Sequence, residues 1–186
     1  MSRFRIIDLP LPGLKRVERL VVGDERGFLS RLFCKEELQA VGWCKPIAQV
    51  NHTLTIQKGT VRGMHFQHAP HAEIKLVNCL HGEIWDVALD LRVESPTYLR
   101  WHAERLSFSN HSALLIPAGF AHGFQALSDD VELLYCHSEP YTPGVEAGLN
   151  PLDPRLAIAW PLPVVTLSTK DTSHAMINSD FQGVRL

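Results

Sequence analysis

Glycine and proline recur along this chain at intervals of about 8 to 12 residues. Because these residues end helices and strands, their spacing is the feature that most limits the possible folds of the chain. The segments between the breaks suit short strands rather than long helices. The clearest of them is residues 82–92, where Trp85, Val87 and Leu89 fall on one face and acidic residues on the other. We therefore predict an all-β fold, a jelly-roll barrel of short strands.

Further strands are expected at 72–79, 113–117 and 131–137. Residues 35–41 are expected to make two helical turns, with Gly42 directly after the helix end. Helices should therefore be few, short and peripheral to the barrel.

We predict a single domain over residues 1–186, because this length suits one hydrophobic core. The core barrel is expected at about 45–145. The proline-rich and then polar segment of about 150–186 is expected to wrap around it.

The composition excludes several classes of partner. Lys and Arg number 18 against 20 Asp and Glu, so there is no broad basic field for a nucleic acid. No apolar run approaches the roughly 20 residues that span a bilayer, and the first residues carry charges where a signal peptide needs an apolar run. The four cysteines lack Cys-x-x-Cys spacing, which argues against a zinc ribbon or a redox dithiol. A cytoplasmic protein is expected.

The segment Gly-Thr-Val-Arg-Gly-Met-His-Phe-Gln at 59–67 carries the strongest chemical signal. It supplies a cation, Arg62, and a candidate base, His65, and a second cation, Lys75, follows on the next expected strand. A histidine with a pKa of about 6.5 is partly neutral at cellular pH and can accept a proton. These residues indicate an enzyme that binds an anionic substrate and removes a proton from carbon beside a carbonyl group.

A second motif at 117–124 and Tyr135 complete a set that resembles a known family. The family is the 3,5-epimerases of nucleotide-linked 4-keto-6-deoxy sugars, typified by dTDP-4-dehydrorhamnose 3,5-epimerase. The resemblance runs from about Asp24 to Asp171, in family order and with family spacing. The matching segments include 24–28, 49–51, 59–67, 75–77, 82–92, 95–97, 117–124 and 168–171.

The resemblance implies a cupin-type barrel (a double-stranded β-helix), a homodimer, and catalysis without a metal or organic cofactor. It implies epimerisation at C3, C5 or both of a nucleotide-diphospho-4-keto-6-deoxyhexose by enolate chemistry, in rhamnose-type deoxysugar biosynthesis. No nucleic acid or membrane partner is implied.

The resemblance also assigns roles to individual residues. His65 matches the base, Asp171 the carboxylate that orients it, and Tyr135 the acid on the opposite face of the sugar. Lys75 places a positive charge beside the developing oxyanion. The residues expected to bind substrate are Arg26, Arg31, Gln49, Asn51, Arg62, His122, Tyr141, Glu146 and Lys170, with Tyr141 stacking on the nucleobase.

Arg62 and His65 differ in parity, so a regular strand cannot point both toward one site. Two explanations stay open. Gly63 hosts a bulge that resets the alternation, or Arg62 serves another site across a dimer interface.

A metal-dependent cupin enzyme is one alternative, because His68, His71 and Glu73 offer ligand types and residues 117–122 match the second cupin motif. The first cupin motif begins with His-x-His, and the sequence at 65–68 lacks that spacing. We therefore expect no metal site.

Departures from the family leave further alternatives open. Arg31 stands where a glutamate is usual, Glu73 where a glutamine is common and Asn78 where an arginine is usual. The reversed charge at Arg31 therefore leaves open a nucleotide other than thymidine. Single-site epimerases and ketoisomerases share most of the matching residues and stay as alternatives, and a non-catalytic sugar-nucleotide-binding module is a further competing hypothesis.

Overall fold

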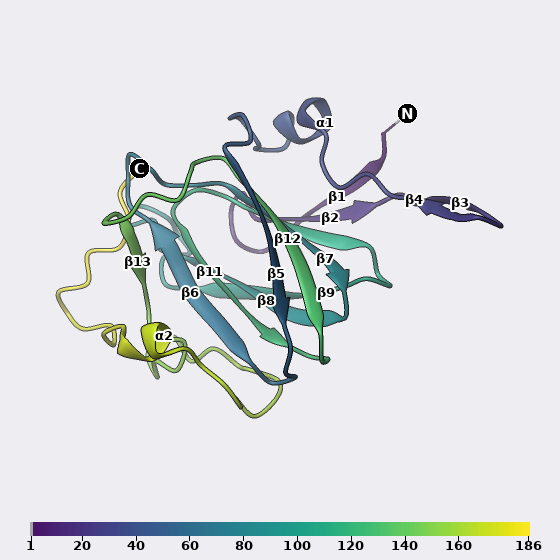
Figure 1. The fold of residues 1–186 in the computed structure, drawn as a ribbon. Helices are drawn as coiled ribbons and strands as arrows, with labels where there is room; N and C mark the ends of the chain where they lie inside the picture. The colour runs from purple at the N-terminus through teal and green to yellow at the C-terminus, as the bar shows by residue number, and fades with distance from the viewer. Residues whose placement is uncertain (1) are drawn as a thin grey trace.

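The computed structural model describes residues 2–186 and shows two antiparallel sheets that face each other (Figure 1). The six-stranded sheet has the order β1 (Phe4–Asp8), β2 (Lys15–Arg19), β10 (Ser112–Ile116), β7 (Lys75–His81), β12 (Val131–His137) and β5 (Gln49–Thr55). The five-stranded sheet has the order β13 (Glu146–Gly148), β6 (Val61–Gln67), β11 (Phe120–Ala126), β8 (Glu83–Asp90) and β9 (Trp101–Ser107).

Four short elements lie outside the two sheets. Strands β3 (Val22–Asp24) and β4 (Gly27–Leu29) form a hairpin that projects from one end of the molecule (Figure 1). Helix α1 (Lys35–Gln39) lies beside the six-stranded sheet, and α2 (Thr169–Ser173) belongs to the C-terminal segment that passes the edge at β6 and β13.

Apolar side chains from both sheets meet in the interior of the barrel. Val77 and Leu133 of the six-stranded sheet share a buried cluster with Ile84 and Phe124 of the five-stranded sheet. The outer faces are covered as well. Leu38 and Trp43 around α1 cover the six-stranded sheet, and residues 149–184 contribute to a cluster on the outside of the five-stranded sheet. Because both faces are buried, several strands read as nearly continuous apolar runs.

The main strand and helix predictions are confirmed. The segment 82–92 contains β8, 113–117 contains most of β10, and 131–137 coincides with β12. Helix α1 lies within the predicted 35–41 but ends at Gln39, so Gly42 is not directly after it as predicted. Gly42 still has a φ of 121°, a value that favours glycine.

Of the two explanations left open for Arg62 and His65, the structure shows the first, a bulge at Gly63. His122 of β11 pairs with His65 of β6, and Phe124 pairs with Arg62, so two residues of β6 oppose one of β11. Gly63 has φ of 121°, and a Cβ there would lie 2.5 Å from the backbone of β11. The extra residue lets Arg62 and His65 line the same cavity.

Within residues 2–186, no helix combines the length and apolar character needed to span a membrane. A cytoplasmic location stays a prediction.

Candidate active site

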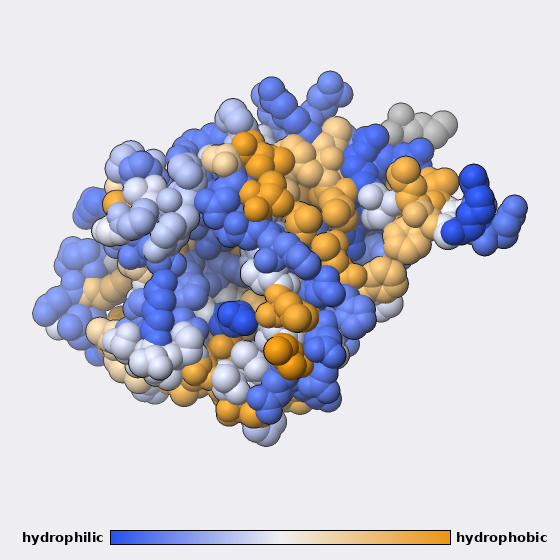
Figure 2. All heavy atoms as spheres, in the orientation of Figure 1, coloured by the Kyte–Doolittle hydropathy of each residue, from blue (hydrophilic) through white to orange (hydrophobic). Residues whose placement is uncertain are grey.

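One end of the barrel encloses a cavity of about 380 Å³. On the molecular surface, hydrophilic residues surround a hollow between β5 and α2 (Figure 2). Strands from both sheets and the C-terminal segment bring the predicted site residues to this cavity. Those that line it are Gln49, Asn51, Arg62, His65, Lys75, His122, Tyr135, Tyr141, Glu146, Lys170 and Asp171.

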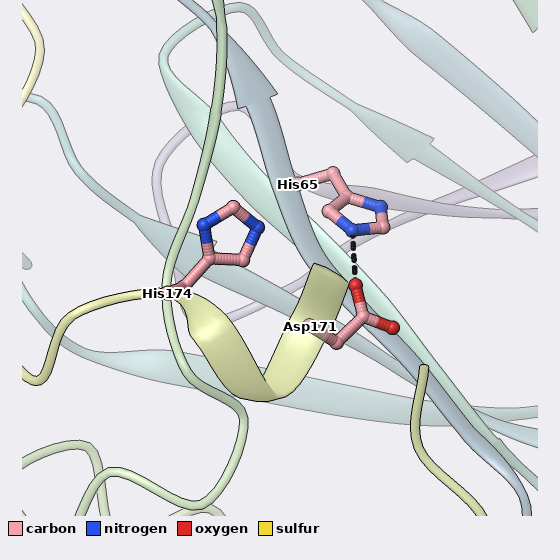
Figure 3. Close-up of side chains that lie close together, drawn as sticks. All are labelled: His65, Asp171 and His174. Carbon is pink, nitrogen blue, oxygen red and sulfur yellow. Dashed lines mark hydrogen bonds and ion pairs between the residues drawn. The ribbon is translucent and has the colours of Figure 1, made fainter. Parts of the chain in front are cut away.

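His65 and Asp171 form a hydrogen-bonded pair in the cavity wall (Figure 3). Nε2 of His65 lies 2.6 Å from Oδ1 of Asp171, although 106 residues separate them. Asp171 is held in the first turn of α2, where its backbone N–H donates to the capping oxygen of Ser168. Burial acts to raise the pKa of Asp171, but the hydrogen bond and charge of His65 outweigh it and lower that pKa below its ordinary value. The ionised carboxylate accepts Nε2–H, which leaves Nδ1 of His65 available as a base.

Tyr135 supplies a buried phenol to the same cavity. Its ring stacks on His137 and meets His122 edge-on, with centroids 5.9 Å apart in each case. Burial raises the pKa of Tyr135, and the negative charge of Asp86 raises it further. The hydroxyl therefore stays protonated and can donate a proton.

Lys75 presents a buried ammonium group between two acceptors. Its Nζ lies 3.1 Å from Oε1 of Glu73 and 3.3 Å from the backbone oxygen of His65. An ammonium has three N–H donors, so one remains for an oxygen inside the cavity. This arrangement can stabilise an anion that forms there.

Other cations and donors line the rest of the cavity. Arg62 is oriented by Thr55, whose hydroxyl accepts from its Nε at 3.0 Å. His122 lies 2.7 Å from the fully buried carboxylate of Asp86. Lys170 pairs with Glu146 at 2.6 Å, and this hydrogen bond raises the pKa of Lys170. The group suits an anionic, hydroxyl-bearing ligand.

Arg26 and Arg31 are not among the residues that line this cavity. Arg26 lies in the projecting β3–β4 hairpin and forms an ion pair with Asp24, and Arg31 pairs with Glu37 next to α1. Neither residue therefore lines this cavity in a single copy of the chain, and their contact with substrate stays a prediction.

Several residues of the site were not assigned a role from the sequence. Those with polar contacts there include Glu73, Asp86, His137 and His174. The sequence could have indicated Asp86, because alternation along β8 puts its side chain on the face opposite the outward-packing apolar residues. Glu73 was noted as a departure from the family and as a candidate metal ligand, but not as a partner of His137, because that contact depends on the pairing of β7 with β12.

His174 completes the one group among the described residues that could hold a metal ion (Figure 3). Ligand atoms of His65, Asp171 and His174 lie within 4.8 Å of one another. Gly148 makes room for the His174 ring, since a Cβ there would lie 2.2 Å from Nε2. The residues that prompted a metal interpretation from sequence, His68 and His71, do not belong to this group.

Comparisons with known proteins agree with this geometry. The sequence model of the dTDP-4-dehydrorhamnose 3,5-epimerase family matches residues 8–179. A dTDP-4-dehydrorhamnose 3,5-epimerase from Shigella flexneri is 39% identical over 178 residues, which cover 95% of this chain and 98% of the relative. A dTDP-4-dehydrorhamnose 3-epimerase from Streptomyces niveus is 38% identical over 174 residues, which cover 93% and 84%.

A solved structure extends the likeness to three dimensions. The dTDP-6-deoxy-D-glucose-3,5-epimerase from Legionella pneumophila, solved in complex with dTDP-4-keto-L-rhamnose, superposes with a TM-score of 0.91 at 37% identity. The alignment covers 98% of this chain and 99% of that one. The resemblance inferred from the motifs and the predicted cupin-type jelly roll are therefore confirmed. This chain belongs to the dTDP-4-dehydrorhamnose 3,5-epimerase family of isomerases.

Proposed function

We propose that this protein inverts C3 and C5 of a dTDP-linked 4-keto-6-deoxyhexose, without a metal or organic cofactor, in deoxysugar biosynthesis. The observation that carries the proposal is that a base, an acid and an ammonium group line one cavity, as His65, Tyr135 and Lys75. Protein side chains can therefore supply each chemical step of enolate formation and reprotonation.

Proton removal falls to His65. A ketone at C4 acidifies the hydrogens at C3 and C5, because the electron pair released moves onto the carbonyl oxygen. Nδ1 of His65 accepts the proton, and the imidazolium that forms is stabilised by the carboxylate of Asp171, 2.6 Å from Nε2.

The enolate oxygen then needs a positive group, and reprotonation needs an acid on the other face. Lys75 offers its remaining N–H to the oxygen in a largely buried setting, where electrostatic stabilisation is strong. The hydroxyl of Tyr135 delivers a proton to the face opposite His65, and the ketone is restored with inverted configuration.

The nucleotide diphosphate would bind toward the open side of the cavity. Arg62, His122 and Lys170 supply cations or donors for it, and Gln49, Asn51 and Glu146 add hydrogen-bonding groups at the wall. The exposed ring of Tyr141 is available to stack on the base. Thymidine is proposed because the relatives described above act on dTDP sugars.

A homodimer would explain how Arg26 and Arg31 could contact substrate although neither lines the cavity of its own chain. The β3–β4 hairpin projects from the body and exposes the apolar side chains of Val22, Phe28 and Leu29 (Figures 1 and 2). Edge strand β5 also exposes apolar side chains. Unpaired edges and apolar patches of this kind favour association with another chain. We propose that the hairpin of one copy packs on a second copy and brings Arg26 toward its cavity.

Mixed dimers test this assignment. His65→Ala and Arg26→Ala are each expected to be nearly inactive alone. When they are unfolded and refolded together, hybrid dimers carry one cavity with both wild-type residues, and activity should return. A monomer in light scattering, or no recovery in confirmed hybrid dimers, would contradict the shared site.

Product analysis tests the function itself. Chelator-treated protein is incubated with dTDP-4-keto-6-deoxyglucose, and the configuration at C3 and C5 is determined by NMR. Inversion at both carbons is expected. Inversion at C3 alone would favour the 3-epimerase activity named for the Streptomyces niveus relative, and activity that requires added metal would contradict the cofactor-free reaction.

A further inference from the structure

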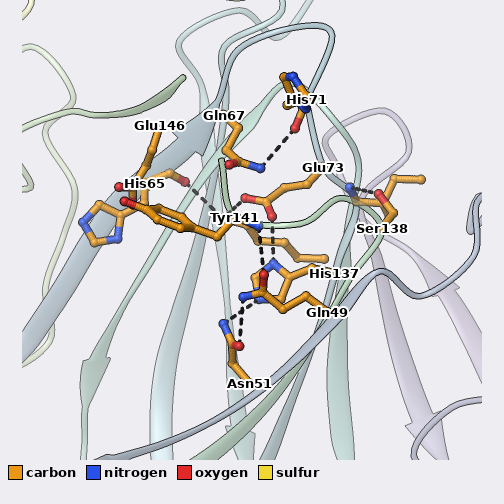
Figure 4. A network of polar contacts seen from close by, with 12 residues as sticks. Gln49, Asn51, His65, Gln67, His71, Glu73, His137, Ser138, Tyr141 and Glu146 are labelled. Atoms are coloured by element: carbon orange, nitrogen blue, oxygen red, sulfur yellow. Dashed lines mark hydrogen bonds and ion pairs between the residues drawn. The ribbon is translucent and has the colours of Figure 1, made fainter. Parts of the chain in front are cut away.

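A continuous set of polar contacts links the loop that carries Tyr141 to the ammonium of Lys75. Figure 4 shows its members from Tyr141 to Glu73. The set passes through the side chains of Gln49, Asn51, His137 and Glu73, which we call the relay. The contacts are Tyr141 N to Gln49 Oε1 at 2.8 Å, Gln49 Nε2 to Asn51 Oδ1 at 2.9 Å, Asn51 Nδ2 to His137 Nε2 at 3.4 Å, His137 Nδ1 to Glu73 Oε2 at 2.8 Å and Glu73 Oε1 to Lys75 Nζ at 3.1 Å.

Strand register brings these residues together. In the six-stranded sheet β12 lies between β5 and β7, and His137 pairs with Gln49 on one side and with Lys75 on the other. Cross-strand partners point to the same face of a sheet, which here is the cavity side. Glu73 precedes Lys75 by two residues and therefore also faces the cavity. Three of the four relay residues thus lie on β5 and β12, and Glu73 lies two residues before β7.

The direction of every hydrogen bond in the relay follows from its first member. The backbone N–H of Tyr141 can only donate, so the Gln49 atom facing it must be the carbonyl oxygen. The Gln49 NH₂ group then faces Asn51, which must present its own oxygen. The Asn51 NH₂ group is therefore the one that faces Nε2 of His137. The backbone N–H of Tyr141, which can only donate, therefore sets the orientation of the Gln49 and Asn51 amide groups.

This direction fixes the state of His137. Nε2 faces a donor and must accept, so the ring proton lies on Nδ1, where it is donated to the carboxylate of Glu73. His137 is then neutral. An imidazolium would place N–H against N–H at Asn51.

Glu73 divides its two oxygens between His137 and Lys75. Burial acts to raise the pKa of Glu73, but the charge of Lys75 and the hydrogen bond from His137 outweigh it and lower that pKa below its ordinary value. The carboxylate is thus ionised and constrained on both sides. It limits the positions that the Lys75 ammonium can take between Glu73 and the backbone oxygen of His65.

We propose that the relay is a positioning device. It couples the placement of the Tyr141 loop to the placement of the Lys75 ammonium through a neutral, Nδ1-protonated His137. Its contribution to turnover rests on the proposed function, in which Lys75 stabilises the enolate. The direction of its hydrogen bonds does not depend on the proposed function. The direction of the hydrogen bonds and the effect on turnover are therefore tested in separate experiments.

The polarity is tested in the free protein by NMR. Protein labelled with ¹⁵N in its histidine rings is recorded near pH 8, and the His137 signals are assigned by their loss in His137→Gln. Nδ1 should show the shift of a protonated nitrogen and Nε2 that of an unprotonated one. A proton on Nε2, with or without one on Nδ1, would overturn the proposal.

Gln49→Glu reverses the polarity with almost no change of shape. Both oxygens of the new carboxylate accept, so Asn51 must turn its NH₂ group toward residue 49 and its oxygen toward His137. Nε2 must then carry a proton while Nδ1–H still faces Glu73, and His137 should become an imidazolium. Gln39→Glu, an exposed site on α1, adds the same charge and should leave the His137 signals unchanged. Unchanged signals in folded Gln49→Glu would overturn the relay.

The effect on catalysis is tested with a matched pair at position 137. His137→Phe keeps a ring but removes both nitrogens, and kcat should fall about 10-fold with a smaller change in KM, because Lys75 and the Tyr141 loop are no longer coupled. His137→Gln keeps one donor and one acceptor and should retain activity within about 3-fold of wild type. Equal activity of the two variants would overturn the positioning role. An inactive wild type would instead count against the proposed function and leave the NMR result standing.

Discussion

The carboxylate of Asp171 accepts a hydrogen bond from Nε2 of His65 over 2.6 Å, and this leaves Nδ1 as the only ring nitrogen free to act as the base. The pair joins β6 to a helical turn that lies 106 residues later in the chain. Its geometry makes the tautomer of His65 depend on one buried acceptor.

Asp171→Asn should lower the rate of deuterium exchange at both C3 and C5 by about 10⁴-fold, as for other histidines that lose the carboxylate fixing their tautomer. The asparagine amide can donate to Nε2, which moves the ring proton to Nδ1 and blocks the base. The measurement is deuterium uptake from D₂O, followed by NMR.

Asp180→Asn is the matched control, because Asp180 is an exposed carboxylate in the same C-terminal segment. It should exchange at the wild-type rate. Comparable loss in both variants would point to a disturbed segment rather than to the tautomer of His65.

Tyr135→Phe should separate proton removal from inversion. His65 is intact in this variant, so exchange on its own face should continue, while delivery of a proton to the opposite face is lost. Deuterium content and product configuration are measured on the same sample. If both fall by the same factor, Tyr135 is not the acid.

Lys75→Gln should lower kcat by roughly 10² to 10³-fold with little change in KM, because the charge that stabilises the enolate is removed. It also leaves the buried carboxylate of Glu73 without its cation, so the melting temperature should fall. Lys58→Gln removes a charge from an exposed lysine and should alter neither quantity. An unchanged kcat in Lys75→Gln would remove Lys75 from the mechanism.

Acid should weaken the fold through Glu73, whose pKa is lowered from 4.5 to about 2. A carboxyl group with a depressed folded-state pKa stabilises the protein fully above about pH 4.5, and this contribution is lost as the pH falls toward 2. The contribution is at most about 3–4 kcal/mol.

The check is the free energy of unfolding at pH 6 and at pH 3.5, measured by urea denaturation. The loss between the two should be smaller in Glu73→Gln than in the wild type. Glu94→Gln, at an exposed site, should lose as much as the wild type. An equal loss in all three proteins would show that Glu73 makes no such contribution.

Gly63→Ala should disrupt the site through the backbone. The new methyl group would lie 2.5 Å from Gly123 Cα, in addition to the strain of a positive φ. Gly144→Ala is the control, because Gly144 also has a positive φ (88°) but nothing lies within 4 Å of a Cβ there. Gly144→Ala should cost about 1 to 2 kcal/mol in the free energy of unfolding, and Gly63→Ala clearly more, together with loss of activity. Equal costs would mean that the bulge tolerates a side chain.

The strands of this fold could be predicted because their signals are local. Alternation at 82–92 and the punctuating glycines reflect backbone geometry within a few residues. The bulge at Gly63 was only one of two explanations that the sequence left open, because local parity showed the conflict between Arg62 and His65 but not how the fold resolves it.

Contacts between strands that are distant in the sequence were harder to predict. The pairing of Glu73 with His137 depends on the register of β7 against β12, which no local pattern encodes. The direction of the β3–β4 hairpin is likewise set by packing, so the sequence indicated a role for Arg26 but not its distance from the cavity of its own chain.

The most direct test of the central claim is deuterium incorporation by the wild type in D₂O with dTDP-4-keto-6-deoxyglucose, compared with His65→Ala. The wild type is expected to place solvent deuterium at C3 and C5 with inversion at both carbons, and His65→Ala to place none at either. Exchange that survives in His65→Ala, or inversion by the wild type without uptake of deuterium, would contradict the account.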